Sequence, residues 1–181
     1  MITQADGNGC LLLNIDGRLH GRNVELQCGM NKKHLSAPDL TQHPPRSPRV
    51  RLGGYALLPR CLDKGRATLV GKNGEYHFDC PMDQHLLTFA GIKAVELKKQ
   101  LALGRGDEEV LQWITAHSKT KPTGAEIAQW SAFQEQRVPG DLETKEFFNG
   151  LLKKLSTTRE DICTWFDLLD LDDHVTFGGK A

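Results

Sequence analysis

Apolar residues recur at helical spacing along most of the chain, and this pattern predicts a mainly helical protein. The first clear helix begins at Pro59, a residue that fits the first turn of a helix. Leu58, Leu62 and Leu69 then mark one buried stripe on a helix that runs to about Val70. This helix is therefore expected to present an apolar face to the core.

Start and stop signals predict six further helices. Gly91 and Gly104 follow two of the apolar segments, as glycine does at helix C-termini. Capping boxes open two others, one over residues 123–126 and one over residues 157–160. The predicted ranges are 81–89, 93–103, 107–117, 124–136, 141–155 and 157–169. Residues 76–79 alternate and predict one short strand. We therefore predict a mainly α fold, a compact bundle of about seven helices with at most one short strand or hairpin.

The first 36 residues differ from the rest. Cys10–Ile15 is typical of a strand, and Asp16-Gly17 predicts a hairpin turn into residues 18–28. A single hairpin is marginally stable in water. We therefore predict that residues 1–36 are an N-terminal extension, either disordered or wrongly included ahead of a natural start at Met30. The alternative is an ordered hairpin on the body. Residues 37–181 are predicted to form a single helical domain.

Composition excludes several classes of protein. No stretch approaches the roughly 18 apolar residues of a membrane span, and the N-terminus has no secretory signal. The five cysteines are odd in number and form no CxxC pair, which argues against a disulfide framework or a structural zinc site. The net charge of zero argues against a nucleic-acid partner. We expect a soluble cytoplasmic protein.

The charges are nevertheless unevenly distributed. Residues 46–66 contain six Lys or Arg and one Asp, whereas residues 159–173 contain one Arg and six acids. Four of these acids fall at or beyond the end of the last predicted helix, where the helix macrodipole disfavours negative charge; they are Asp167, Asp170, Asp172 and Asp173. Their spacing lacks the Gly and the final Glu of a calcium loop. We therefore expect them to meet the basic segment, within one chain or across a homodimer.

The basic segment has features of an anion site. Pro44, Pro45 and Pro48 keep its first part extended, while Arg60 and Lys64 share one face of the first helix. Gly53-Gly54 lets backbone approach closely just before this helix. Arginines beside a helix N-terminus favour phosphate or carboxylate. The predicted ligand-binding residues, called the basic strip below, are Arg46, Arg49, Arg60, Lys64 and Arg66, with Tyr76 as a hydroxyl donor. The alternative is a structural layer of salt bridges with the acidic segment.

Cys80 is the main candidate for catalysis. With Pro81 as the first helical residue, Cys80 becomes the N-cap, where free amide groups favour a thiolate. Asp83 would oppose this effect, and cysteine is among the residue types most often buried. His77 and His85 could act as bases, but their spacing with Cys80 matches no metal motif. Asp63 and Lys64 form a second candidate, as an acid/base pair. We predict neither a metal nor a cofactor.

Common catalytic motifs do not fit the chain. Gly104-Arg105-Gly106 is only superficially similar to a phosphate-binding loop, because it joins two predicted helices and no strand precedes it. Neither a Gly-x-Ser-x-Gly nor an HExxH motif is present. The sequence therefore excludes Rossmann and P-loop sites and gives no evidence for a serine hydrolase or a zinc protease.

Several short motifs occur in a characteristic order. They are Pro45-Arg46-Ser47-Pro48-Arg49, Leu52-Gly53-Gly54-Tyr55, Leu58-Pro59-Arg60, Asp63-Lys64-x-Arg66-Ala67, Gly74-Glu75-Tyr76, Cys80-Pro81-x-Asp83, and the run from Thr164 to Asp170 that continues to Gly179. In order and spacing the chain resembles a bacterial domain-of-unknown-function family, the one numbered five-zero-six-nine, from about Leu40 to the C-terminus. The resemblance implies a shared fold and supplies no activity. Residues 1–36 lie outside it.

Three functional hypotheses follow. The first is an uncharacterised intracellular domain that binds an anionic small molecule or an acidic partner at the basic strip. The second is an enzyme that uses Cys80 or the Asp63/Lys64 pair. The third is a structural or oligomerisation module in which a basic face meets an acidic face, and such a contact must close as a two-fold to avoid open chains.

Overall fold

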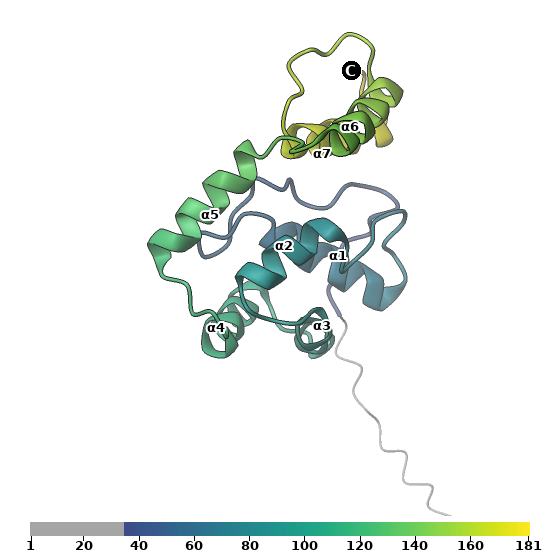
Figure 1. The fold of residues 1–181 in the computed structure, drawn as a ribbon. Coiled ribbons are helices and arrows are strands. Elements are labelled where there is room, and N and C mark those ends of the chain that lie inside the picture. The colour runs from purple at the N-terminus through teal and green to yellow at the C-terminus, as the bar shows by residue number, and fades with distance from the viewer. Residues whose placement is uncertain (1–34) are drawn as a thin grey trace, which may run out of the picture. The chain divides into compact units, whose positions relative to one another are not determined.

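The chain folds into α-helices throughout the part that is structurally described. The computed structural model describes residues 35–181, and these residues contain seven helices and no strand (Figure 1). Their bounds are α1 Leu58–Val70, α2 Pro81–Phe89, α3 Ala94–Ala102, α4 Asp107–His117, α5 Gly124–Gln136, α6 Leu142–Leu155 and α7 Trp165–Thr176. All seven belong to one unit, Lys32–Ala181. The predicted mainly α fold of about seven helices is confirmed.

Helix α1 lies at the centre of this unit, because every residue from Leu58 to Ala67 is buried. Pro59 occupies its first turn, as predicted, and Gly71 caps its C-terminus in the left-handed conformation. α1 packs against α3, and α3 packs against α4. A helix that is buried on all sides must bury its charged residues too, and this makes α1 the scaffold of the basic strip.

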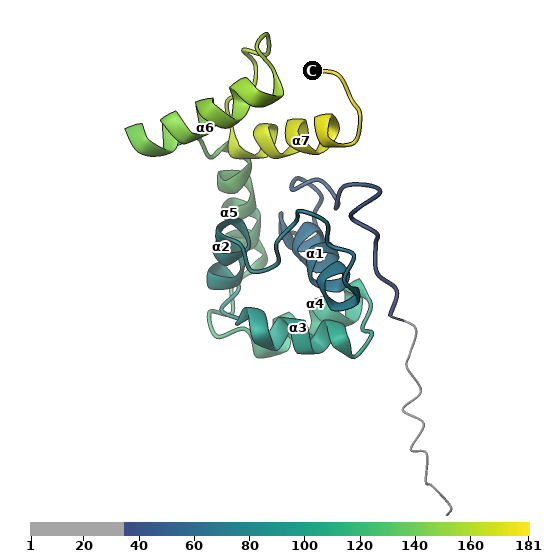
Figure 2. The same cartoon turned by 90° about the vertical axis from the view of Figure 1, so that its right-hand side faces the viewer.

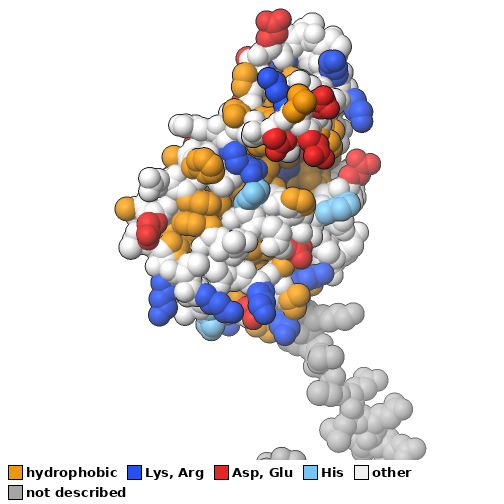
Figure 3. Space-filling model, in the orientation of Figure 1, with side chains coloured by type: hydrophobic (Ala, Val, Ile, Leu, Met, Phe, Trp, Pro, Cys, Tyr) orange, Lys and Arg blue, Asp and Glu red, His pale blue; other side chains and the backbone are white. Residues whose placement is uncertain are grey.

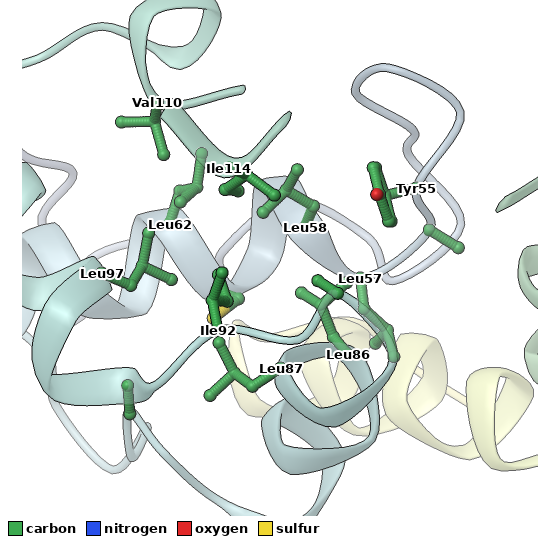
Figure 4. Packing of buried hydrophobic residues seen from close by; sticks show 14 of the residues in the cluster. Tyr55, Leu57, Leu58, Leu62, Leu86, Leu87, Ile92, Leu97, Val110 and Ile114 are labelled. Atoms are coloured by element: carbon green, nitrogen blue, oxygen red, sulfur yellow. The ribbon is translucent and has the colours of Figure 1, made fainter. Parts of the chain in front are cut away.

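The apolar side of α1 forms the main core. Leu58 and Leu62 are within 1% of full burial and point toward Val110 and Ile114 of α4 (Figure 4). Leu97 of α3 closes the same cluster. Fully burying a leucine side chain stabilises a fold by about 1.5–3 kcal/mol, so this cluster holds α1, α3 and α4 together.

Gly65 allows α1 and α3 to approach closely. A β-carbon at this position would lie 2.5 Å from Leu101 Cδ1 and 3.1 Å from Phe78 Cε2. Any larger residue would force these two side chains to move, and overpacking of this kind usually costs about 1–3 kcal/mol. The absence of a side chain at position 65 therefore sets the spacing between the two helices.

Helices α6 and α7 pack against each other, and α5 packs against α7 (Figure 2). A smaller apolar core lies between α6 and α7 and consists of Phe148, Ile162, Leu168 and Leu171. The Phe148 ring meets the ring of Trp165 edge-on, with centroids 5.3 Å apart. Most of the acidic segment thus lies on α7, a helix that packs against α6 through this smaller apolar core.

The last helix starts later than predicted. Thr164, not Thr157, is its N-cap: Thr164 Oγ1 accepts from the Asp167 amide at 3.1 Å, and Asp167 accepts from the Thr164 amide at 2.9 Å. The expected box at 157–160 is not helical, and Arg159 instead pairs with Asp161 at 2.6 Å. The predicted range 157–169 was therefore wrong at both ends.

Two further predictions concern local structure. The short strand expected at 76–79 is wrong, because these residues form a turn ahead of α2. Most of the predicted extension, residues 1–34, lies outside the described residues. None of the helices in the described part is both long enough and apolar enough to cross a membrane.

Candidate functional site

The basic strip is assembled on α1, but each of its cations already has a carboxylate partner. The most buried pair joins Arg60 to Asp173 of α7 through two hydrogen bonds of 2.6 and 3.0 Å. The two side chains are only 5% and 7% exposed. Tyr76 donates its hydroxyl to the same carboxylate at 2.8 Å, and the Arg60 guanidinium lies over the Tyr76 ring.

Electrostatics reinforce this contact. Burial by itself lowers the pKa of Arg60, but the Asp173 carboxylate outweighs it and the net shift is upward. Burial and the same carboxylate raise the pKa of Tyr76. Arg60 therefore stays charged and Tyr76 stays protonated, so this end of the strip holds α7 in place.

Lys64 makes the second buried pair. Its ammonium lies 2.8 Å from Asp83 Oδ1 and 3.3 Å from Cys80 Sγ. The other carboxylate oxygen of Asp83 accepts from the Asp79 amide at 3.0 Å, which fixes its orientation. Burial acts to lower the pKa of Lys64, but Asp83 and Cys80 raise it and prevail. Lys64 is thus a buried cation that ties α1 to the start of α2.

Arg46 and Arg66 share a third cluster with Asp63 and Asp107. Asp63 accepts three hydrogen bonds from Arg46, at 3.0 Å from the amide and at 2.9 and 2.8 Å from the guanidinium. Asp107, the first residue of α4, accepts from Arg46 and from Arg66, each at 2.6 Å. Burial acts to raise the pKa of Asp107, but the two arginines lower it overall.

Arg49 is the most exposed cation of the strip. It contacts Asp167 and Asp170 of α7, the latter at 3.2 Å, and its side chain is 40% exposed. Its guanidinium also lies over the Phe166 ring, 5.8 Å from the centroid. Exposed pairs are worth only about 0–1 kcal/mol each. This contact therefore adds little to stability compared with the buried pairs.

Together these contacts form an ion-pair layer around α1. The acidic segment supplies part of this layer within one chain, because Asp167, Asp170 and Asp173 pair with Arg49 and Arg60. The other three cations of the strip pair with Asp63, Asp83 and Asp107, and Asp172 has no cationic partner within residues 35–181.

The expectation that the aspartates lie at a helix end is wrong for Asp167 and Asp170. Asp167 lies in the first turn of α7, where a carboxylate is favourable, and Asp170 lies mid-helix, whereas Asp173 is in the last turn.

The proposed acid/base pair of Asp63 and Lys64 is not assembled. Adjacent residues on a helix point in directions about 100° apart. Asp63 is therefore bonded to Arg46, while Lys64 is bonded to Asp83.

Gly53 and Gly54 form a tight turn, with Leu52 and Tyr55 hydrogen-bonded across it.

Cys80 does occupy the N-cap of α2, as predicted, but its sulfur contacts Lys64 and caps no amide. It is half-buried, whereas Cys61 is fully buried and burial raises the pKa of the Cys61 thiol. His77 is exposed, and His85 lies 2.7 Å from the Arg137 guanidinium. In residues 35–181, His, Cys, Asp and Glu form no group of three that could hold a metal ion.

A pocket of about 380 Å³ opens beside the third cluster. Arg66 and Arg105 line it, together with the carboxylates of Asp63 and Asp107. No carboxylate within residues 35–181 lies within 4 Å of the Arg105 guanidinium. The floor includes the loop at residues 104–106, immediately before the first turn of α4. The remaining lining residues are Leu35, Ser36, Pro38, Gly104 and Gly106.

Comparison with protein families gives a match over the helical part of the chain. The model of the family described as Domain of unknown function (DUF5069) matches residues 42–175. The chain belongs to this family. The match spans all seven helices except the last residue of α7, and it includes every residue of the basic strip. None of the curated proteins matches the chain significantly. The DUF5069 chain is thus assigned to a family that is uncharacterised.

Sequence reasoning missed Arg105 and Asp107 as partners of the strip. From the sequence, Asp107 indicates only the start of a helix, and the loop at 104–106 has no strand before it. No local signal joins residue 105 to residue 66, since the packing of α4 against α3, and of α3 against α1, brings them together. An arginine between two glycines, just before a helix, was the available clue.

Proposed function

We propose that the DUF5069 domain binds a small anionic ligand, a phosphate or a carboxylate, in the pocket between Arg66 and Arg105. The observation that carries this proposal is that Arg105 lines the pocket and has no carboxylate within 4 Å of its guanidinium in residues 35–181. The other charges of the lining, Arg66, Asp63 and Asp107, balance once the adjoining Arg46 is included, because both aspartates pair with arginines. The ion-pair layer holds Arg66 in place before any ligand arrives, which lowers the cost of ordering the site.

The location favours an anion for a second reason. The first amides of a helix have no partner within the helix, and the helix dipole adds partial positive charge there. The N-terminus of α4 adjoins the pocket. Glu108 and Glu109 of the first turn oppose an anion, and Glu109 Oε2 already accepts from the Gly106 amide at 2.8 Å. Both side chains are exposed to solvent, which weakens the effect of their charges. Arg105 is therefore the cation left to meet a ligand.

Arg105→Gln should abolish anion binding without loss of stability, because the Arg105 side chain has no carboxylate partner in residues 35–181. Phosphate and citrate are each titrated into the full chain while thermal unfolding is followed. At ten times the dissociation constant, a ligand adds about 1.4 kcal/mol, which is a shift of roughly 3–6 °C. The variant should unfold at the unliganded temperature of the wild type and show no shift.

Arg51→Gln is the matched control, since Arg51 is an exposed arginine that pairs with Glu135 away from the pocket. It should retain the full shift. The proposal is wrong if neither anion shifts the wild type, or if Arg105→Gln responds as strongly as Arg51→Gln does.

A second function is supported by one contact. Cys80 Sγ lies 3.3 Å from the Lys64 ammonium at the start of α2, and a neighbouring cation stabilises the thiolate that acts as nucleophile. Asp83 opposes this effect, because it already shares the Lys64 charge. This arrangement supports an enzyme or redox site that uses Cys80, without identifying a substrate.

Iodoacetamide labelling at pH 7 tests this second function. We expect Cys80 to react faster than Cys163, although Cys163 is exposed and Cys80 is half-buried. Each thiol is measured alone, in the full chain with Cys10, Cys28 and the other of the pair replaced by serine; Cys61 is buried in both. Mass spectrometry after timed quenching gives the two rates. Labelling of Cys80 at or below the rate of Cys163 would eliminate the thiol function.

A further inference from the structure

Helix α6 carries a face that is largely uncovered by the rest of residues 35–181. The Phe147 side chain is 60% exposed, although its ring lies 6.5 Å from that of Trp165. Apolar side chains are interspersed with acidic and basic ones over the α6–α7 region (Figure 3). The buried side of α6, centred on Phe148, is already covered by α7. The Phe147 side is therefore a second, unpartnered face.

Gly150 lies on this face, and no neighbouring atom of residues 35–181 requires a glycine there. A β-carbon there would meet nothing within 4 Å, and glycine inside a helix costs about 1 kcal/mol relative to alanine. This contrasts with Gly65, where a side chain would collide with Leu101. A glycine with open space beside an exposed phenylalanine forms a shallow gap next to a projecting ring.

The charges on the same face are complementary to a second copy of the face. Spacings of four, three and four residues align one stripe, which consists of Glu143, Phe147, Gly150 and Lys154. The acid is at the N-terminal end and the lysine is at the C-terminal end. In residues 35–181 neither has a partner of opposite charge within 4 Å.

We propose that two copies of the chain associate through antiparallel α6 helices. In a two-fold arrangement centred between Phe147 and Gly150, Phe147 of one copy rests on Gly150 of the other. The same register places Glu143 opposite Lys154, twice by symmetry. Both pairings, each present twice by symmetry, follow from a single register, because 147 and 150 have the same sum as 143 and 154. A two-fold contact of this kind closes and does not form chains.

This surface differs from the homodimer that we predicted from the sequence. That dimer would pair a basic face with an acidic one, but the α7 carboxylates Asp167, Asp170 and Asp173 contact arginines of their own chain. The α6 contact leaves the ion-pair layer and the Arg105 pocket unchanged. One pair of crossing helices buries little surface, so the dimer should be weak, with a dissociation constant of roughly micromolar or above.

Charge exchange tests the register. Sedimentation equilibrium of the full chain over a concentration series should show a monomer–dimer equilibrium that weakens as salt is raised. Glu143→Lys alone, or Lys154→Glu alone, should weaken dimerisation by roughly tenfold, since two attractive pairs become repulsive. The double variant Glu143→Lys/Lys154→Glu should restore the wild-type dissociation constant, because each exchanged lysine again faces a glutamate.

The control places the same exchange elsewhere: Glu96→Lys/Lys99→Glu on α3 should leave dimerisation unchanged. All four residues are exposed, so the variants are expected to fold, and circular dichroism checks this. Gly150→Leu should also abolish the dimer while the monomer stays folded, as a leucine side chain fills the gap. A monomer at every concentration overturns the proposal, and so does a dimer whose affinity is unaffected by the single exchanges or not restored by the double one.

Discussion

Asp173→Asn is expected to lower the free energy of unfolding by about 3–5 kcal/mol, because it leaves the Arg60 guanidinium buried without a counter-charge. Proteins of this kind are typically stable by only 5–15 kcal/mol, so the loss is a large fraction of the total. The amide matches the carboxylate in shape, and its oxygen can still accept from Tyr76 and from Arg60 Nη2. Its nitrogen replaces the oxygen that accepts from Arg60 Nη1, so the variant removes one hydrogen bond together with the charge. Urea denaturation followed by circular dichroism measures the change.

Asp170→Asn is the control for this substitution. Asp170 is on the same helix and also contacts an arginine, but its contact with Arg49 is between side chains that are 35% and 40% exposed. The expected loss is about 0–1 kcal/mol. Equal losses for the two variants would show that burial of the Arg60 pair does not matter.

Lys64→Met should lower the free energy of unfolding by a similar amount. Here the charge left buried without a partner is negative, whereas in Asp173→Asn it is positive. The Asp83 side chain is 2% exposed, so removing the ammonium leaves a buried carboxylate that accepts from the Asp79 amide but has lost its counter-charge. We expect a loss of about 3–5 kcal/mol at pH 7.

The double variant Lys64→Met/Asp83→Leu distinguishes the loss of one charge from the loss of the pair. Replacing both members of a buried ion pair by apolar groups is often neutral or stabilising. We therefore expect it to be at least as stable as Lys64→Met alone, and close to the wild type. Urea denaturation at pH 7 compares the variants. A double variant less stable than Lys64→Met alone would contradict this explanation.

The sequence predicted the start of a helix well where a capping side chain near that start determines it. Thr123 and Asp141 cap α5 and α6 as expected, since each side chain accepts from an amide three residues later. The last helix was misplaced because two threonines carry similar capping signals. The start at Thr164 prevails because it buries Phe166, Leu168 and Leu171 on one side of the helix.

The composition of the strip was predicted, but its pairing was not. Sequence analysis left two arrangements open for the arginines, an anion site and a layer of salt bridges. The choice depends on contacts between residues more than 100 positions apart, such as Arg60 with Asp173, and periodicity gives no information about these. Arg105 was missed for the same reason, because its proximity to Arg66 depends on how three helices pack.

The buried ion pair of Arg60 with Asp173 holds α7 against α1. The most direct measurement is the coupling free energy from a double-mutant cycle with Arg60→Met, Asp173→Asn and the double variant. The predicted result is a coupling of about 2–3 kcal/mol, the upper part of the range for residues in contact, with a double variant more stable than the sum of the single losses implies. Losses that simply add would mean that the two side chains do not stabilise each other, and would contradict this role of the pair.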